Sequence, residues 1–212
     1  DIIFSFISLT LLIPIFIPLI IILRITAEGE VFYFQNRVGL KNSNFYIWKF
    51  ATMLKNSMEM GTGSITLKND FRVTRLGKFL RKTKINELPQ IINILKGDIS
   101  LVGPRPLVNK TFNAYSKEIQ AKIYNVKPGL TGIGSIVFRD EEAIISNIKD
   151  EDPHEFYKRV IAPFKGALEI WYQDNCSFSL DLQLIFMTAW VIIFPNSRLY
   201  ENFFKDLPKR EF

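Results

Sequence analysis

Glu87 and Asn86 stand side by side in the segment INELPQIINILKGD (residues 85–98), directly ahead of an apolar run. A carboxylate can serve phosphate chemistry as a nucleophile, a general base or a metal ligand. A neutral amide is a poor nucleophile and a weaker magnesium ligand. Any such chemistry therefore depends first on Glu87. In the simplest interpretation, Glu87 only complements the positive end of a helix dipole.

The spacing around Glu87 predicts a helix with one buried face, because four apolar residues recur at i, i+3, i+4 and i+7. They are Leu88, Ile91, Ile92 and Leu95. Gly97 should end this helix. Since Pro89 is tolerated only in a first turn, the helix should begin near Asn86, with Asn86 or Thr83 as its cap. Glu87 would then lie in the first turn, where the dipole favours an ionised side chain and a bound phosphate.

Two basic residues lie in segments whose prolines or glycines restrict or alter the backbone conformation. Arg105 stands between Pro104 and Pro106 in SLVGPRPL, so its guanidinium should be presented rigidly, which suits a phosphate. A surface arginine in a stiff turn is the simpler alternative. Lys127 begins the turn-rich stretch KPGLTGIGS, whose glycines could bring backbone amides close to an anion. This stretch is not a P-loop.

Other chemistries have little support. His154 is the only histidine and Cys176 the only cysteine, which excludes an internal disulfide, a cysteine-rich zinc site and a multi-histidine metal site. Asp150 and Asp152 have the Asp-x-Asp form of metal-dependent glycosyltransferases. However, they lie with His154 in the charged tract KDEDPHE, which is typical of a solvated loop or a helix cap.

The densest positive stretch is FRVTRLGKFLRKTK, which reads as an amphipathic cationic helix. Its basic residues recur at helical spacing: Arg72, Arg75, Lys78, Arg81 and Lys82. This face should meet anionic lipid headgroups or a diphosphate, or else remain solvated. A net charge of +6 also favours an anionic partner. Nucleic acid is disfavoured, because the stretch carries few aromatic side chains and no recognised binding motif.

The N-terminal segment has no charged residue from Ile2 to Leu23, a length that would just cross a bilayer as a helix. Pro14 and Pro18 interrupt it, so a break or a sharp bend is expected near Pro14. A kinked span and a helix that enters and leaves on one side fit equally well, and a signal peptide fits less well. Basic residues follow directly, which predicts that the rest of the chain is cytoplasmic.

The remaining pattern predicts an α+β fold. Residues 31–36 should form a strand that ends at Gly39, and residues 47–54 a second strand or the start of a helix. The apolar stretch 177–194 carries Asp181 and Gln183 near its start. We therefore expect a helix that lies at the membrane interface or packs on the protein, rather than one that spans the membrane. At 212 residues, the chain should form one compact domain with one appended element.

The order of several motifs resembles the bacterial sugar transferase family of small monotopic phosphoglycosyl transferases. These motifs are the proline-broken apolar segment, FYFQNRVGLKNSNFYIWKFATM, FRVTRLGKFLRKT, INELPQIINILKGDISLVGPRP, VKPGLTG and WYQDNCSFSLDLQLI. The resemblance covers nearly the whole chain. ELPQ followed at this spacing by KGD-x-SLVGPRP is highly specific.

The resemblance implies a re-entrant helix (residues 1–26) bent at Pro14, and a catalytic domain (residues 27–212) on the cytoplasmic face of the bacterial inner membrane. With Mg²⁺, such enzymes move a sugar 1-phosphate from a nucleotide diphosphate sugar, here expected to be a UDP-sugar, to polyprenol phosphate in the bilayer. The resemblance assigns Glu87 and Asn86 to catalysis, and Glu87 is also the expected metal ligand. Glu169, an acidic residue just before WYQDN, could complete a magnesium site. Four cations are the expected phosphate ligands, the first two favoured by the resemblance: Lys49, Arg105, Lys127 and Arg139. The sequence predicts no particular sugar, base or oligomeric state.

Asn86 is the main departure from the family, whose pattern has an aspartate nucleophile at this position. Ala51 also replaces an expected cation, and Ile13 stands where serine is common. Four explanations fit Asn86: Glu87 is the nucleophile; the polyprenol phosphate attacks directly with Glu87 as base or metal ligand; Asn86 was introduced and disables the enzyme; or the protein only binds lipid or nucleotide sugar. We favour an active enzyme that depends on Glu87.

Overall fold

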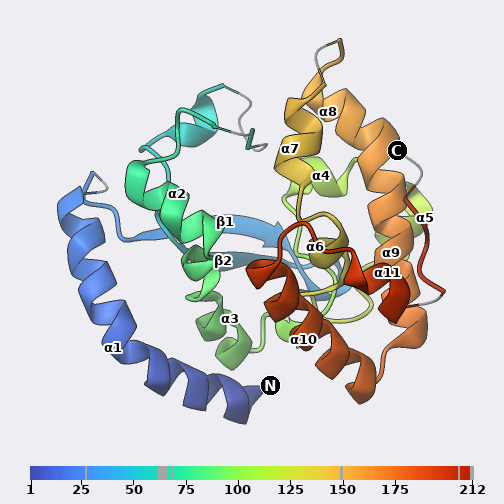
Figure 1. Ribbon diagram of the computed structural model, residues 1–212, viewed down its shortest axis with the longest axis horizontal. Helices are drawn as coiled ribbons and strands as arrows, with labels where there is room; N and C mark the ends of the chain where they lie inside the picture. Colours follow the sequence, from blue (N-terminus) through green and yellow to red (C-terminus); the bar gives the residue numbers. More distant parts are fainter. Residues whose placement is uncertain (27, 62–65, 68, 149, 205, 211–212) are drawn as a thin grey trace.

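A computed structural model shows an α+β body with an apolar helix running along its outer side (Figure 1). The structure describes residues 1–26, 28–61, 66–67, 69–148, 150–204 and 206–210. Its sheets are small, and helices make up most of the body. The α+β class predicted from the sequence is confirmed.

Helix α1 (Ile2–Thr26) is continuous through Pro14 and Pro18, so no break occurs, but it bends between its two ends (Figure 1). Its inner side packs on the body, where the Phe16 ring meets the Phe50 ring edge-on at 5.2 Å between centroids. Most of its other side chains are exposed. Among the described residues, it is the one helix long and apolar enough to cross a membrane. The predicted domain boundary at residue 27 lies outside the described residues.

Strands β1 (Phe32–Val38) and β2 (Asn44–Phe50) form an antiparallel hairpin, joined by a short 3₁₀ turn, η1 (Leu40–Asn42). The first strand and its end at Gly39 are confirmed, and residues 44–50 adopt the strand alternative rather than a helix start. Tyr33 pairs with Lys49 in this register. Strand β2 buries Ile47 and Phe50, which lie on opposite faces of the hairpin because side chains alternate along a strand.

Helix α2 (Arg75–Lys82) follows the short turn η2 (Ser57–Glu59) and the segment after it. Thr74 caps α2 by accepting a hydrogen bond from the Gly77 amide. The prediction that Arg72 belongs to the cationic helix face is wrong. Arg72 lies ahead of α2 and is 1% exposed, because its guanidinium is held by Asp70 at 2.6 Å and by the Ser57 carbonyl.

The segment that carries Glu87 differs from the predicted helix start. Residues Ile85–Glu87 form a 3₁₀ turn, η3, after Lys84 in the left-handed region (φ 61°). Helix α3 (Gln90–Lys96) begins only after Pro89, which occupies the N-cap position, so neither Asn86 nor Thr83 caps it. The predicted end at Gly97 is confirmed, with φ 80°.

The buried face of α3 is also shifted from the prediction. Its buried residues are Gln90, Ile91, Asn93 and Ile94. Leu88, Ile92 and Leu95 are only half-buried. Asn93 is buried because its side chain bonds the backbone of β2 at the Trp48 amide and the Tyr46 carbonyl. A polar contact with the hairpin therefore changes the face that apolar periodicity predicted.

Strands β3 (Ser100–Val102) and β4 (Gly129–Thr131) pair in parallel, which joins the SLVGPRP and VKPGLTG motifs. The two backbones approach so closely that a Cβ at Gly129 would lie 2.1 Å from the Gly103 nitrogen. Only glycine allows this contact. The Gly129 amide donates to the Pro104 carbonyl at 2.9 Å, so it is not available to an anion, contrary to the sequence expectation.

The other helices pack around these strands and enclose the larger core. They are α4 (Asn109–Phe112), α5 (Lys117–Lys122), α6 (Ile133–Val137), α7 (Glu141–Ser146), α8 (Pro153–Phe156), the π-helical turn η4 (Tyr157–Ile161), α9 (Ala162–Asn175), α10 (Phe178–Ile193) and α11 (Leu199–Phe203). Helix α10 confirms the apolar helix predicted at 177–194. It buries Leu184 and Met187 but exposes Phe178 and Phe186.

Candidate active site

Glu87 lies at the meeting point of three segments: η3, strand β2 and the turn after β3. Its carboxylate atom Oε1 accepts from Lys49 Nζ at 3.1 Å and from Arg105 Nη2 at 3.0 Å. The Glu87 side chain is only 12% exposed. The structure therefore brings together three of the residues predicted for the site, on a carboxylate whose Oε2 lies outside both ion pairs.

Further cations surround this carboxylate. Burial by itself would raise the pKa of Glu87, but the charges of Lys49, Arg105 and Lys84 outweigh it and hold that pKa well below its usual range. Glu87 also acts electrostatically on Arg139, whose Nη2 lies 3.5 Å from the Lys82 carbonyl. Glu87 is therefore ionised at neutral pH, and positive charge in its surroundings exceeds its single negative charge.

Burial and neighbouring positive charge both disfavour the charged forms of Lys49 and Arg37. Burial lowers the pKa of Lys49 to about 7, and the nearby Arg105 and Arg37 act in the same direction, against Glu87. Burial and the Arg105 charge likewise lower the pKa of Arg37 to about 10. Because these cationic side chains repel one another, an anionic ligand should stabilise the site. Phosphate oxygens accept hydrogen bonds from both guanidinium and ammonium groups.

Asn86 is buried beside Glu87, and its Oδ1 has no hydrogen-bond partner among the residues that the structure describes. A buried oxygen without a partner is unusual and calls for a ligand, water or ion. An amide oxygen is a hard ligand, which Mg²⁺ accepts. Asn86 and Glu87 Oε2 are thus two oxygens that could meet a substrate-bound cation.

Glu169, predicted as the second metal ligand, lies on α9 on the far side of Arg105. Its Oε1 accepts from the Arg105 backbone amide at 3.4 Å, while the Arg105 guanidinium reaches Glu87. Burial raises the pKa of Glu169 to about 7, against the charges of Lys165 and Arg105. No group of three or more acidic, histidine or cysteine residues that could hold a metal occurs in the described parts of the chain.

Lys127 lies apart from the other predicted phosphate ligands. Its side chain is exposed, and its Nζ would lie 3.5 Å from a Cβ placed at Gly97, at the end of α3 opposite Glu87. The structure therefore groups Lys49, Arg105 and, more loosely, Arg139 around Glu87. Lys127 remains a separate prediction.

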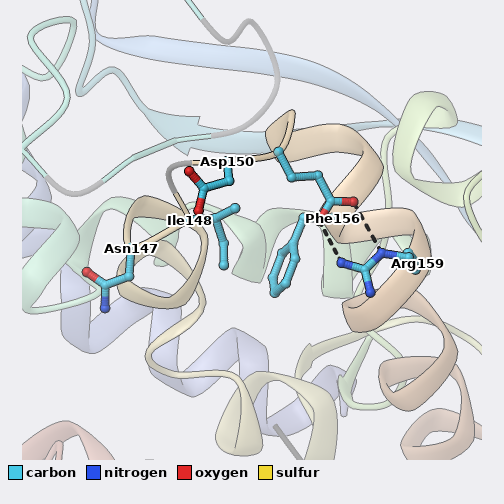
Figure 2. Close-up of a pocket in the computed structure, with 6 residues that line it drawn as sticks. Asn147, Ile148, Asp150, Phe156 and Arg159 are labelled. Atoms are coloured by element: carbon cyan, nitrogen blue, oxygen red, sulfur yellow. Dashed lines mark hydrogen bonds and ion pairs between the residues drawn. The ribbon is translucent and has the colours of Figure 1, made fainter.

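The Asp-x-Asp tract has structural roles on the surface. Asp152 caps α8 by accepting from the His154 and Glu155 amides. Glu151 pairs with Arg159 at 2.6 Å, beside a shallow depression of about 320 Å³ whose lining residues include Asp150 and Phe156 (Figure 2). The His154 ring nitrogen Nε2 lies 2.8 Å from Lys110 Nζ. The tract therefore caps a helix, as predicted. The residues that line the depression do not contact Glu87.

Sequence reasoning missed Lys84 and Arg37 as members of the cluster. Lys84 precedes Glu87 by one 3₁₀ turn, and the Lys84 pKa is lowered: Glu87 raises it, but burial and the Arg105 and Arg139 charges together outweigh that effect. Arg37 is on β1 and donates to the Pro106 carbonyl at 2.9 Å. The sequence could have indicated Lys84, because this lysine lies three residues before Glu87. It could not show that β1 brings Arg37 close to the same carboxylate.

An apolar helix attached to an α+β body, with a cationic cluster around one carboxylate, fits a protein that associates with a membrane. The chain belongs to the bacterial sugar transferase family, whose model matches residues 1–195. The family resemblance read from the sequence is thereby confirmed.

Individual relatives carry more specific names. The chain is 35% identical over 196 residues to a UDP-N-acetylgalactosamine-undecaprenyl-phosphate N-acetylgalactosaminephosphotransferase of Aeromonas hydrophila, covering 91% of this chain and 42% of that protein. It is 34% identical over 193 residues to a UDP-glucose:undecaprenyl-phosphate glucose-1-phosphate transferase of Klebsiella pneumoniae, covering 90% and 38%. An uncharacterized sugar transferase of Bacillus subtilis is 38% identical over 170 residues, covering 80% and 73%. The chain thus spans less than half the length of the first two relatives.

Proposed function

We propose that this chain transfers a sugar 1-phosphate from a UDP-sugar to polyprenol phosphate, giving a polyprenyl diphosphate sugar and UMP. Relatives with similar sequences are named for transfers of this class. The single observation that carries the proposal is the cationic cluster around ionised Glu87. Both substrates are phosphates that repel one another, and fixed cations offset this repulsion in the transition state.

Glu87 is best suited to act as the nucleophile. With its pKa held low it is a weak base, and an ionised polyprenol phosphate needs no base to attack. A Glu87 carboxylate oxygen would form a bond to the phosphorus attached to the sugar while the bond from that phosphorus to the UMP oxygen breaks. A polyprenol phosphate oxygen would then attack the same phosphorus and release the carboxylate.

Direct attack by polyprenol phosphate is the alternative mechanism, and the two differ in one exchange reaction. If Glu87 forms a covalent intermediate, labelled UMP should exchange into UDP-sugar without any polyprenol phosphate. Absence of this exchange, with normal turnover when acceptor is present, would favour direct attack.

Lys49 and Arg105 are the phosphate ligands in this proposal. Each reaches the same Glu87 oxygen, so a diphosphate placed beside Glu87 would meet both cations. Their ion pairs with Glu87 hold them in position before substrate binds, which reduces the reorganisation needed in the transition state. Arg139 and Lys84 would contribute longer-range charge, and Lys127 a more distant contact.

Mg²⁺ is expected as a cofactor carried by the diphosphate. Mg²⁺ usually keeps several waters and binds proteins through one or two carboxylates together with substrate phosphates. Glu87 and the unpartnered Asn86 Oδ1 fit this pattern. Glu169 has one oxygen bonded to the Arg105 amide, and its buried Oε2, like Asn86 Oδ1, has no hydrogen-bond partner among the described residues. The bound metal would supply further charge neutralisation to the diphosphate.

The proposed location is the cytoplasmic face of the bacterial inner membrane, with α1 as a re-entrant helix in contact with phospholipids. The bend of α1 and the exposure of its outer side support this (Figure 1). Exposed Phe79 on α2 and Phe186 on α10 would add interfacial contacts. The deciding measurement is whether both ends of α1 are labelled by a thiol reagent from the same side of a vesicle, after single cysteine substitutions in a chain whose exposed Cys176 is replaced by Ser.

A binding protein without turnover is the second candidate function, and Asn86 is the observation that favours it. The decisive assay incubates the chain with a panel of UDP-sugars and polyprenol phosphate and measures UMP. UMP release with at least one sugar would support the transferase. Retained binding of UDP-sugar without UMP release under any condition would support the binding protein.

A further inference from the structure

The segment 104–107, which carries Arg105, has every backbone hydrogen-bonding group occupied. Pro104 and Pro106 lack amide hydrogens, so the segment offers two donors and four acceptors. At its ends, the Pro104 carbonyl accepts from the Gly129 amide at 2.9 Å and the Leu107 carbonyl accepts from the Val38 amide at 2.8 Å. Strand β4 and the end of β1 therefore fix the two ends of the segment.

Three side chains satisfy the remaining four groups. The Tyr124 hydroxyl donates to the Arg105 carbonyl at 2.9 Å and accepts from the Leu107 amide at 2.9 Å. Glu169 accepts from the Arg105 amide. Arg37 donates to the Pro106 carbonyl. These three residues come from β1, the segment after α5, and α9, so distant parts of the chain converge on one turn.

Tyr124 has the central place in this arrangement. It is 1% exposed, and its ring stacks on Phe112 at 5.8 Å between centroids. Burial raises the Tyr124 pKa, so the hydroxyl stays protonated and remains a donor. A single hydroxyl thus ties the carbonyl of residue 105 to the amide of residue 107, and spans Pro106 between them.

We propose that Tyr124, Glu169 and Arg37 are positioning residues that hold the Arg105 guanidinium at the phosphate-binding position beside Glu87. None of the three needs to touch substrate for this role. The assignment rests on the proposed function for its catalytic consequence, but the clamp itself is a property of the folded chain. Misplacement of a catalytic group by about 1 Å can cost roughly a hundredfold in rate.

The first test is Tyr124→Phe, which keeps the ring and removes the hydroxyl. We expect kcat for UMP release to fall roughly ten- to a hundredfold. Tyr172→Phe is the matched control, because Tyr172 is also buried and its hydroxyl donates to Asp181 at 2.8 Å, away from Arg105. If both variants lose the same activity, a positioning role for Tyr124 is excluded.

A double-mutant cycle with Arg105→Lys separates positioning from general destabilisation. If Tyr124 acts through Arg105, Tyr124→Phe should cost much less in the Arg105→Lys background than in the native chain. An equal cost in both backgrounds would overturn the proposal.

An NMR measurement tests the clamp without turnover. The Nε–H signal of Arg105, assigned by its loss in Arg105→Lys, should shift or broaden in Tyr124→Phe and stay unchanged in Tyr172→Phe. An unchanged signal in Tyr124→Phe would overturn the clamp. If the native chain releases no UMP, the proposed function fails, and this signal alone decides whether the clamp exists.

Discussion

The Asn86–Glu87 turn and the segment 104–107 face each other through the Glu87–Arg105 ion pair, yet different interactions hold them. Hydrogen bonds occupy every backbone group of the segment 104–107. In the turn, charges hold Glu87, and the Asn86 oxygen is unpartnered among the described residues. Hydrogen bonds in a closed network respond little to salt, whereas a crowded cluster of charges is screened by it. The turn should therefore be the adjustable side of the site.

The strongest test of this difference is Glu87→Gln. We expect UMP release to fall by roughly a thousandfold or more, because an amide neither attacks phosphorus nor balances the cations. Glu142→Gln is a suitable control, since Glu142 pairs with Arg81 on an exposed surface. Undiminished turnover in Glu87→Gln would exclude the catalytic role of Glu87.

Glu169→Gln tests the hydrogen-bonded side through stability. Because burial raises the pKa of Glu169 to about 7, the folded state holds its proton more tightly than the unfolded state. The contribution of this group to stability therefore falls as pH rises from its ordinary pKa to about 7. The native chain should lose about 3 kcal/mol from this group over that window.

Glu169→Gln should remove that pH dependence while it keeps an acceptor for the Arg105 amide. The measurement is thermal or denaturant unfolding of both chains, in the same detergent, on both sides of the window. If the two chains show parallel pH dependence, Glu169 does not titrate there.

The substitution Asn86→Asp tests how far added negative charge in the Asn86–Glu87 turn changes turnover. A carboxylate next to Glu87 would supply a second anionic nucleophile or ligand inside the cationic cluster. We expect turnover to rise roughly ten- to a hundredfold. Asn86→Leu, which keeps the size but removes the polar oxygen, is the matched control. If Asn86→Asp is no faster than the native chain, the native amide does not limit the reaction.

The sequence predicted the parts of this site that depend on local pattern. Gly97 ended the helix as expected, and the proline pair around Arg105 indicated a stiff segment. The start of α3 was wrong because Lys84 adopts a left-handed conformation and the chain continues as a 3₁₀ turn. Propensity alone gives little warning of such a turn.

Long-range contacts account for the other differences. Arg72 fits a cationic helix by spacing, but a carboxylate two residues earlier and carbonyls from residues 57 and 60 bury it. The Tyr124 hydroxyl meets Arg105 only because α5 returns the chain to β3. Glu169 was a candidate magnesium ligand because it is acidic, and its contact with a backbone amide depends on the packing of α9. No pattern along a single sequence encodes these approaches.

The pH dependence of substrate binding gives the finest test of the charged side. Since burial lowers the pKa of Lys49 to about 7, Lys49 loses its charge as pH rises through neutrality. KM for the UDP-sugar should therefore increase roughly tenfold from about pH 6 to about pH 8.5, the value of one charge-assisted hydrogen bond. Lys49→Arg should flatten this increase, because arginine stays protonated throughout the range.

Lys122→Arg is the matched control for Lys49→Arg, since Lys122 is exposed and pairs with Glu118. It should leave the native pH profile of KM unchanged. If the Lys49→Arg profile also matches the native one, Lys49 is not the group whose titration changes KM, and the assignment of this pH dependence to Lys49 fails.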